Sequence, residues 1–577
     1  MKKKLLPALI VTGLIILVVI IMGITALINK YTPTKKTEDL KEYFNISSDD
    51  EAALIVDNEL SDYKAKIIDK KIYVDYKFVH DSLNSRFYWD ANENVLLYTT
   101  ASDIISAAAD SNSYSVTKQT NDFGYPIVKA TSDSALIALD YVKQYSNITF
   151  KSYDDPARIV ITSKWDEIDS ATVSKSTQVR VKGGIKSPIL KEVKKDDKIT
   201  ILDSGDKWDK VATEDGVIGY IKRKALSESK KTKLTNPDYE EETFTHIKKD
   251  KDICLAWNQV TSQSANSKVP QVISSTKGIN VMSPTWFYLN DNNGNLADIA
   301  SKDYVSYCHS QGIEVWGLFS NLENTDVDAA YVLTHTSTRT TLINQIMSAA
   351  FNYELDGVNI DFENITEAAY GDSYIEFIRE LSIKCHNNGI SLSVDVTVPA
   401  SFNKFFNRSD MAKFADYIVI MGYDEHYKGS DAGSVSSIPW VTEGVESTLK
   451  EVPADQIILG MPFYTRIWEL TPKEDDDAVT DTEDQSKYTV ASQVYSMDAA
   501  AAQLATNNAT AALDEESGQN YAEWSASNKL YKVWLEDNTS LENRLKLVDD
   551  NKLAGAAFWK LGFENSSVWD TVIKYLD

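Results

Sequence analysis

The chain has 577 residues and a net charge of −26, because 85 acidic side chains outnumber 59 basic ones. This length exceeds one ordinary domain, so three or four domains are expected. The acidic balance argues against nucleic acid as a partner, since phosphate binding needs clustered Lys and Arg. A hydrophobic content of 43% predicts a largely globular chain.

Cysteine and histidine give no sign of a metal site. Cys254, Cys308 and Cys385 are far apart in the sequence, and we predict that they are small buried side chains rather than disulfide partners. The six histidines show no metal-ligand spacing. The sequence therefore predicts neither a bound metal nor a cofactor.

The N-terminus has the pattern of a membrane segment. Three lysines precede an uncharged run over residues 5–28, which as a helix would be about 36 Å long and enough to cross a bilayer. The run has no clear small-x-small cleavage site, which favours an uncleaved single-pass transmembrane anchor over a signal peptide. We expect the polar residues 30–45 to form a tether and the C-terminal domains to lie outside the cell, on a bacterial cell surface.

Residues 46–165 read as short strands and helices. Among them are the apolar runs Lys71–Val74, Phe87–Asp90 and Val95–Tyr98. The pattern resembles the small N-terminal domain of copper amine oxidases, which implies an α+β spacer domain without an active site.

Residues 169–227 predict a small β-barrel of short alternating strands separated by turns that contain Gly and Asp. The run Trp208…Asp215-Gly216…Gly219-Tyr220-Ile221 resembles the bacterial SH3-like domain. Such domains bind peptidoglycan peptides or act as spacers, and the sequence leaves both roles open. Residues 228–243 are charged, contain Pro237 and are predicted to be a linker.

From residue 244 to residue 577, eight apolar runs alternate with helical patterns. Near-continuous apolar strands separated by helices predict a parallel sheet covered on both sides, and eight such units fit a (β/α)₈ TIM barrel. The predicted strands are Ile253–Trp257, Ile279–Trp286, Glu314–Ser320, Gly357–Glu363, Ser391–Pro399, Tyr417–Tyr423, Ile457–Phe463 and Ala554–Leu561.

Polar and aromatic residues gather where these strands end. On the fourth strand Asn359, Asp361 and Glu363 are two residues apart, so their side chains would share one face. In a (β/α)₈ barrel the carboxyl ends of the strands build the active site. The sixth, seventh and eighth strands are predicted to bring to the same rim Met421, Tyr423, Asp424, Tyr464, Arg466 and Trp559.

The barrel resembles glycoside hydrolase family 18. Its signature, Asp-x-x-Asp-x-Asp-x-Glu at the end of the fourth strand, is matched by Asp356, Asp361 and Glu363, with Asn359 in the second Asp place. Met421-x-Tyr423-Asp424 and Trp559 also match the family. The runs Gly460–Tyr464 and Val533–Asp537 are similar to the branch found in spore and cell-wall hydrolases.

The resemblance implies catalysis in which the acetamido group of the substrate is the nucleophile. Glu363 would be the general acid, with its pKa raised by the neighbouring Asp361. Asp361 would orient the acetamido group, and Tyr423 would hydrogen-bond to its carbonyl oxygen. Trp559 would form an apolar floor under the sugar.

The remaining predicted residues bind substrate or support the site. Asp424, Tyr464 and Arg466 would hydrogen-bond to sugar groups, and Met421 lies beside them in the same motif. Asp356 is out of phase with the other acids and is assigned a structural role. Asn359, which replaces the acid of the family, is predicted to donate a hydrogen bond to Asp361 and so keep it ionised.

We predict a membrane-anchored hydrolase of β-1,4 bonds in polysaccharide that contains N-acetylglucosamine, with peptidoglycan favoured by the anchor and the SH3-like module. The alternatives are a chitinase, a non-catalytic lectin that binds the cell wall, and a scaffold that depends on the SH3-like module. The acidic run 474–484 is predicted to be a solvated insertion rather than a calcium site. A helix over Ala499–Asn508 would follow, with Asp498 as its N-cap.

Overall fold

A computed structural model describes residues 2–365, 368–473 and 484–576. The chain divides into two compact units. The N-terminal unit comprises residues 1–89, 107–114 and 121–241, and the C-terminal unit comprises residues 90–106, 115–120 and 242–577. Most of the predicted acidic run 474–484 lies outside the described residues.

The chain begins with one long apolar helix, α1 (Lys2–Tyr31). Its residues Pro7–Tyr31 are long and apolar enough to cross a membrane, a form that signal sequences and membrane anchors share. The residues after it differ from the predicted tether. Glu38 N donates to the Ile189 carbonyl at 2.8 Å, and Phe44 is buried. Within the predicted tether, residues 30–45, only Leu40, Tyr43 and Phe44 pack against this apolar core. The mostly polar sequence of the segment therefore gave no sign that it would pack.

Residues 51–162 supply a seven-stranded sheet. Its strand order is β11-β12-β1-β2-β3-β10-β9, and β1 (Glu51–Val56) pairs in parallel with β12 (Arg158–Thr162). The other strands are β2 (Glu59–Ile68), β3 (Lys71–Asp75), β9 (Val128–Ala130), β10 (Ala135–Ala138) and β11 (Thr149–Tyr153).

A second seven-stranded sheet, β15-β14-β18-β17-β16-β13-β19, is antiparallel throughout. Its last strand, β19 (Lys230–Lys233), falls within the predicted linker. It pairs with β13 (Glu167–Thr172), and Lys231 forms an ion pair with Asp169 at 3.1 Å. The other strands are β14 (Thr177–Arg180), β15 (Ile189–Val193), β16 (Lys198–Asp203), β17 (Trp208–Thr213) and β18 (Ile218–Lys222).

The two sheets of the N-terminal unit share one apolar core. Ala53 and Ile55 from the first sheet are buried in the same cluster as Val179 and Val211 from the second. At the turn before β18, Gly216 has a φ of +83°, and a Cβ atom there would lie 2.8 Å from a methyl carbon of Val160. Glycine is therefore required for the turn conformation and for the close approach to β12.

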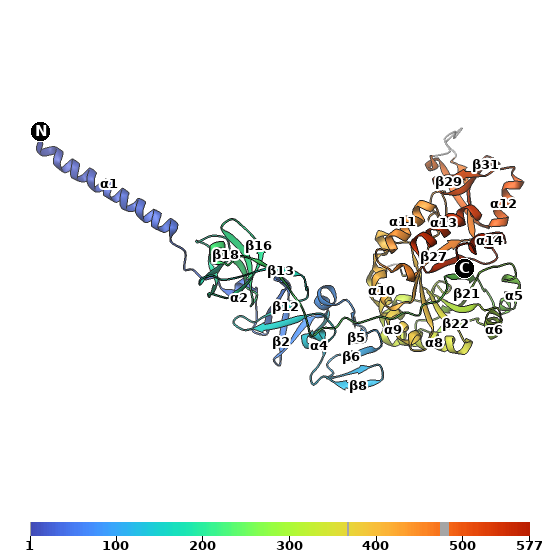
Figure 1. Cartoon of the computed structure of the whole chain (residues 1–577), viewed down its shortest axis with the longest axis horizontal. Coiled ribbons are helices and arrows are strands. Elements are labelled where there is room, and N and C mark those ends of the chain that lie inside the picture. The colour runs from blue at the N-terminus through green and yellow to red at the C-terminus, as the bar shows by residue number, and fades with distance from the viewer. Residues whose placement is uncertain (1, 366–367, 474–483, 577) are drawn as a thin grey trace. The chain divides into compact units, whose positions relative to one another are not determined.

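The C-terminal unit contains the predicted closed barrel. Its eight parallel strands run in the ring order β20-β33-β27-β26-β25-β24-β23-β21, and pairing of β20 with β21 closes it. Figure 1 shows helices around the outside of these strands, among them α8 (Thr336–Tyr353), α9 (Gly371–His386), α11 (Ile438–Thr448) and α13 (Asn538–Asn551). The strands are β20 (Ile253–Asn258), β21 (Val281–Leu289), β23 (Glu314–Ser320), β24 (Gly357–Asp361), β25 (Ser391–Thr397), β26 (Tyr417–Met421), β27 (Ile457–Pro462) and β33 (Gly555–Trp559).

Alternation along the strands produces two apolar layers. Leu255, Val281, Leu318 and Val419 fill the interior of the barrel. Residues of the opposite parity, such as Ile360, pack against the surrounding helices. The free cysteines are buried as predicted: Cys254, Cys308 and Cys385.

A five-stranded antiparallel sheet, β29-β28-β32-β31-β30, is inserted between β27 and β33. It begins with β28 (Tyr464–Pro472), which pairs with β29 (Tyr488–Ser496) and β32 (Lys529–Leu535). The other two strands are β30 (Ala512–Asp514) and β31 (Gln519–Ala526). The predicted helix follows as α12 (Met497–Thr506). Its N-cap is Ser496 rather than Asp498, because the Ser496 side chain accepts from Ala499 N.

A hairpin segment, residues 90–106, packs on the outside of the barrel within the C-terminal unit. The Asp90 carboxylate accepts from Thr336 N and from Thr336 Oγ1, both at 2.6 Å. Thr336 is the first residue of α8 (Thr336–Tyr353), whose own N-cap residue His335 makes no side-chain cap hydrogen bond. Thr99 also donates to buried Glu376 on α9 (Gly371–His386) at 2.8 Å. The hairpin thus supplies a hydrogen-bond acceptor for the N-terminus of α8, which has no side-chain cap from its own N-cap residue.

Candidate active site

Three predicted residues lie at the carboxyl end of β24. Asn359 and Asp361 are on the strand and are buried, whereas Glu363 follows the strand and is exposed at the barrel mouth. The strand is two residues shorter than predicted. Asp356, at the other end of the strand, accepts from Val315 N and from His309 Nε2, each at 2.8 Å, which agrees with a structural role.

The Asn359 amide makes four hydrogen bonds, and none of them reaches Asp361. Its Oδ1 accepts from Trp257 Nε1 and from Ser283 Oγ, each at 3.0 Å. Its Nδ2 donates to Ser393 Oγ at 3.0 Å and to Asp395 Oδ1 at 2.7 Å. The predicted bond to Asp361 is therefore wrong: both amide hydrogens are engaged by side chains of β25.

Asp361 lies in a strongly acidic environment. Burial raises the pKa of its carboxyl well above the usual range, and the charges of Asp395, Glu363 and Glu323 raise that pKa further. Its Oδ1 has no hydrogen-bond partner among the described residues. The site therefore leaves one buried hydrogen-bond acceptor free.

Glu363 also has a raised pKa. Burial contributes most, followed by the charges of Asp424 and Glu323. Glu363 and Asp361 also repel each other, since the charge of Glu363 helps to raise the pKa of Asp361. Because the side chain also contacts solvent, these charges are partly screened. A raised pKa keeps a carboxyl protonated closer to neutral pH, as a general acid requires.

Two aromatic rings meet at the floor of the site. Tyr423 and Trp559 both form edge-to-face contacts with the buried ring of Trp257, at centroid distances of 6.5 and 6.0 Å. Burial and the nearby charges of Asp361 and Asp395 raise the pKa of Tyr423 well above its usual range. The Tyr423 hydroxyl thus stays protonated and can donate a hydrogen bond.

Asp424, Tyr464 and Arg466 form a connected polar group. The Tyr464 hydroxyl donates to Asp424 Oδ1 at 2.5 Å, and an Arg466 nitrogen lies 3.7 Å from the same oxygen. The structure places Tyr464 and Arg466 on β28 of the inserted sheet, and not at the end of the seventh barrel strand as predicted. The residues still converge because β28 follows β27 after one residue.

Met421, the last residue of β26, lines a cavity of about 170 Å³ beside the acids. Glu363 and Asp395 open onto this cavity, and the exposed ring of Phe402 stands at its edge. All nine predicted catalytic and substrate-binding residues therefore belong to the carboxyl ends of the strands or to the segments that follow them.

Sequence reasoning missed Asp395, Trp257 and Glu323. Asp395 interrupts the apolar run of the fifth strand. This residue could have been identified from the sequence, because an acid on a fully buried strand needs a partner. Trp257 is the next-to-last residue of the first barrel strand and resembles an ordinary core residue. Glu323 lies in a loop whose approach to the acids no local pattern indicates.

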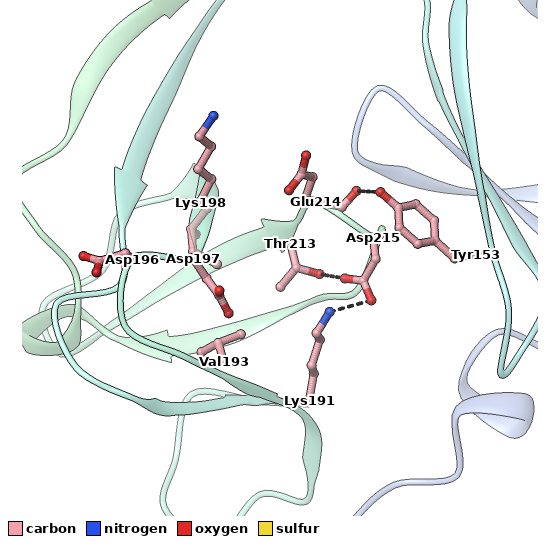
Figure 2. Close-up of a pocket in the computed structure, with 10 residues that line it drawn as sticks. Tyr153, Lys191, Val193, Asp196, Asp197, Lys198, Thr213, Glu214 and Asp215 are labelled. Atoms are coloured by element: carbon pink, nitrogen blue, oxygen red, sulfur yellow. Dashed lines mark hydrogen bonds and ion pairs between the residues drawn. The ribbon is translucent and has the colours of Figure 1, made fainter.

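A second, larger pocket of about 410 Å³ lies in the N-terminal unit. Figure 2 shows Lys191 pointing toward Asp215, which Thr213 also contacts. Tyr153 closes one side by donating to the Glu214 carbonyl at 3.0 Å.

Within the described ranges, no group of three or more His, Cys, Asp or Glu side chains has a metal-holding arrangement.

Comparison with known proteins agrees with this site. Residues 319–564 match the family model described as glycosyl hydrolases family 18. A cortical fragment-lytic enzyme of Bacillus subtilis (strain 168) is 25% identical over 287 residues, which cover 48% of this chain and 63% of that protein. An uncharacterized glycosylase of the same organism is 24% identical over 301 residues, or 49% of this chain and 81% of the relative.

The fold has a solved counterpart as well. The spore cortex-lytic enzyme of Bacillus cereus has a TM-score of 0.50 and 18% identity, covering 60% of this chain and 79% of that one. At this identity the likeness supports the fold alone. The C-terminal barrel is thus similar, over residues 319–564, to the glycosyl hydrolases of family 18.

Proposed function

We propose that the chain cleaves β-1,4 bonds in polysaccharide that contains N-acetylglucosamine, by substrate-assisted retaining catalysis. One observation carries the proposal: Glu363, with a raised pKa, stands at the barrel mouth above buried Asp361, whose Oδ1 has no partner among the described residues. A single proton donor beside a carboxylate that can accept an amide N–H is what this chemistry needs.

The proposed reaction has two steps. Glu363 donates its proton to the glycosidic oxygen while the carbonyl oxygen of the substrate acetamido group attacks the anomeric carbon. The bond to the leaving sugar breaks, and a cyclic oxazolinium ion forms. The Glu363 carboxylate then removes a proton from water, which attacks the anomeric carbon and restores the acetamido group with retained configuration.

Neighbouring side chains hold the acetamido group during these steps. Asp361 accepts its N–H and stabilises the positive charge, and the Tyr423 hydroxyl donates to its carbonyl oxygen. Trp559, packed against Trp257, offers an apolar face to the sugar ring. Asp424, Tyr464 and Arg466 are placed to bind polar groups of the adjacent sugar.

Peptidoglycan is the proposed substrate class. One of the similar proteins, from Bacillus subtilis, is named as a cortical fragment-lytic enzyme, which supports a wall polymer. Chitin is the alternative, because a probable endochitinase of Caenorhabditis elegans also matches, at 24% identity. A lectin function requires a site that binds but does not cleave, which the presence of Glu363 argues against.

The N-terminal unit would hold the enzyme at its substrate. In this proposal α1 is an uncleaved membrane anchor, and the sheet over residues 167–233 is an SH3-like contact with the wall. The sheet over residues 51–162 would be a spacer similar to that of copper amine oxidases. Fractionation of cells that carry a C-terminally tagged full chain tests the anchor: recovery of a soluble, shortened form would contradict it.

One experiment separates the catalytic alternatives. The full chain in detergent is incubated with purified peptidoglycan or with chitin, and the released reducing ends are identified by mass spectrometry. We expect N-acetylglucosamine at the new reducing ends from peptidoglycan, and no release by Glu363→Gln. Cleavage of chitin alone would make the protein a chitinase, and equal release by the Glu363→Gln variant would refute the proposed chemistry.

A further inference from the structure

Among the described residues of this site, Asp395 is the one buried acid that the family signature does not include. It lies on β25, is 3% exposed and accepts from Asn359 Nδ2 at 2.7 Å. The strand pairing places Asn359 opposite Ser393 and Ile360 opposite Val394. The next residues in this register are Asp361 and Asp395, on neighbouring strands about 4.8 Å apart.

The Asn359 amide fixes which oxygen of Asp395 can face Asp361. The Trp257 indole nitrogen can only donate, so the amide oxygen must face it and the amide nitrogen must face β25. Asp395 Oδ1 therefore already receives an N–H group, which disfavours a proton on that oxygen. Oδ2 of Asp395 is thus the better oxygen to hold a proton toward Asp361.

The groups around the two acids are predominantly negative or neutral. Glu363 follows β24, Tyr374 reaches the pair from α9, and Tyr423 follows β26; the charges of Asp361 and Asp395 act on both tyrosines. In the described part of the chain, no lysine, arginine or histidine forms an ion pair with either carboxyl. Two unpaired buried carboxylates so close together would repel, and sharing one proton relieves that cost.

We propose that Asp395 is a positioning residue that shares a single proton with Asp361, taking over from the strand-four acid that this chain replaces with Asn359. When the substrate N–H approaches, the proton moves to Asp395 Oδ2 and leaves Asp361 as the carboxylate that accepts it. When the proton returns to Asp361, the Asn359 amide stabilises the charge left on Asp395. The proton is conserved, and no covalent bond between heavy atoms forms or breaks.

This inference rests on the proposed function, and the first test is kinetic. Removing the charge of Asp395 lowers the pKa of Asp361, so Asp395→Asn should shift the acidic limb of kcat/KM to lower pH and reduce kcat about tenfold. The exchange variant Asn359→Asp/Asp395→Asn returns a second acid to the site. It should restore most of kcat and return the acidic limb of kcat/KM toward its original pH. Asp455→Asn, the same change at an exposed ion pair with Lys248, is the matched control.

The second test needs no activity. In a Glu363→Gln background, infrared difference spectroscopy near neutral pH should detect a protonated-carboxyl band that is absent when Asp395→Asn is added. Loss of that signal supports the shared proton even if neither glycan is cleaved, so the inference and the proposed function can fail separately. An unchanged carboxyl signal, or an acidic limb that Asp395→Asn leaves in place, would overturn the inference, as would an exchange variant no better than Asp395→Asn.

Discussion

The contact between the hairpin of residues 90–106 and helix α8 gives a quantitative prediction. Asp90 Oδ2 accepts from Thr336 N and Oγ1 at 2.6 Å, while its Oδ1 accepts from Asn92 N at 2.9 Å within the hairpin turn. Asp90→Asn keeps an acceptor for the turn but places an NH₂ group against the helix. Loss of a helix N-cap costs about 0.5–2 kcal/mol, and the burial of Asp90, 1% exposed, puts this case near 2 kcal/mol.

Hydrogen exchange measured by mass spectrometry detects the loss of this cap directly at the first turn of α8. A loss of about 2 kcal/mol in local opening free energy would raise exchange of the first-turn amides of α8 roughly 30-fold. Asp49→Asn, at a side chain that is 98% exposed, is the matched control and should leave α8 unchanged. Equal protection of α8 in Asp90→Asn and the parent would refute the proposed cap.

Three further predictions concern the active site. Tyr423→Phe should reduce kcat about 10²–10³-fold with little change in thermal stability, because one donor to the acetamido oxygen is lost, and steady-state kinetics with a melting curve would show it. Asp424→Asn should move the basic limb of kcat/KM to lower pH, because removing a negative charge lowers the pKa of Glu363; a pH profile with the same basic limb would contradict this. Trp559→Ala should weaken binding of an N-acetylglucosamine oligomer by roughly tenfold, or about 1.4 kcal/mol, in calorimetric titration, and undiminished affinity would show that the ring does not contact the sugar.

The barrel could be predicted because its signals are local. Each strand is a short apolar run, and the polar residues at the strand ends follow the two-residue period that separates the faces of a strand. Glu363 and its neighbours therefore converge as expected. The prediction erred where chain segments turn away from this pattern, as at Tyr464 and Arg466, which begin a new sheet instead of ending a barrel strand.

Interactions between strands were harder to predict. The bond from Asn359 to Asp395 joins residues 36 positions apart, so it depends on the strand register, which the sequence of one strand does not contain. In the N-terminal unit, the polar segment after α1 gave no sign that it would pair with Ile189, because backbone hydrogen bonds do not depend on side-chain type. In both cases the sequence did not show which segment would pair with which, although the strands and helices themselves were easier to predict.

The fixed orientation of the Asn359 amide has an evolutionary consequence. If the acid on the fifth strand compensates for the amide on the fourth, the two positions should change together among related chains. Homologues with Asp at the position of residue 359 would be free to carry a small apolar residue at that of residue 395, whereas those with Asn would retain the acid. An alignment in which the two positions vary independently would show that the acid at residue 395 does not compensate for the amide at residue 359.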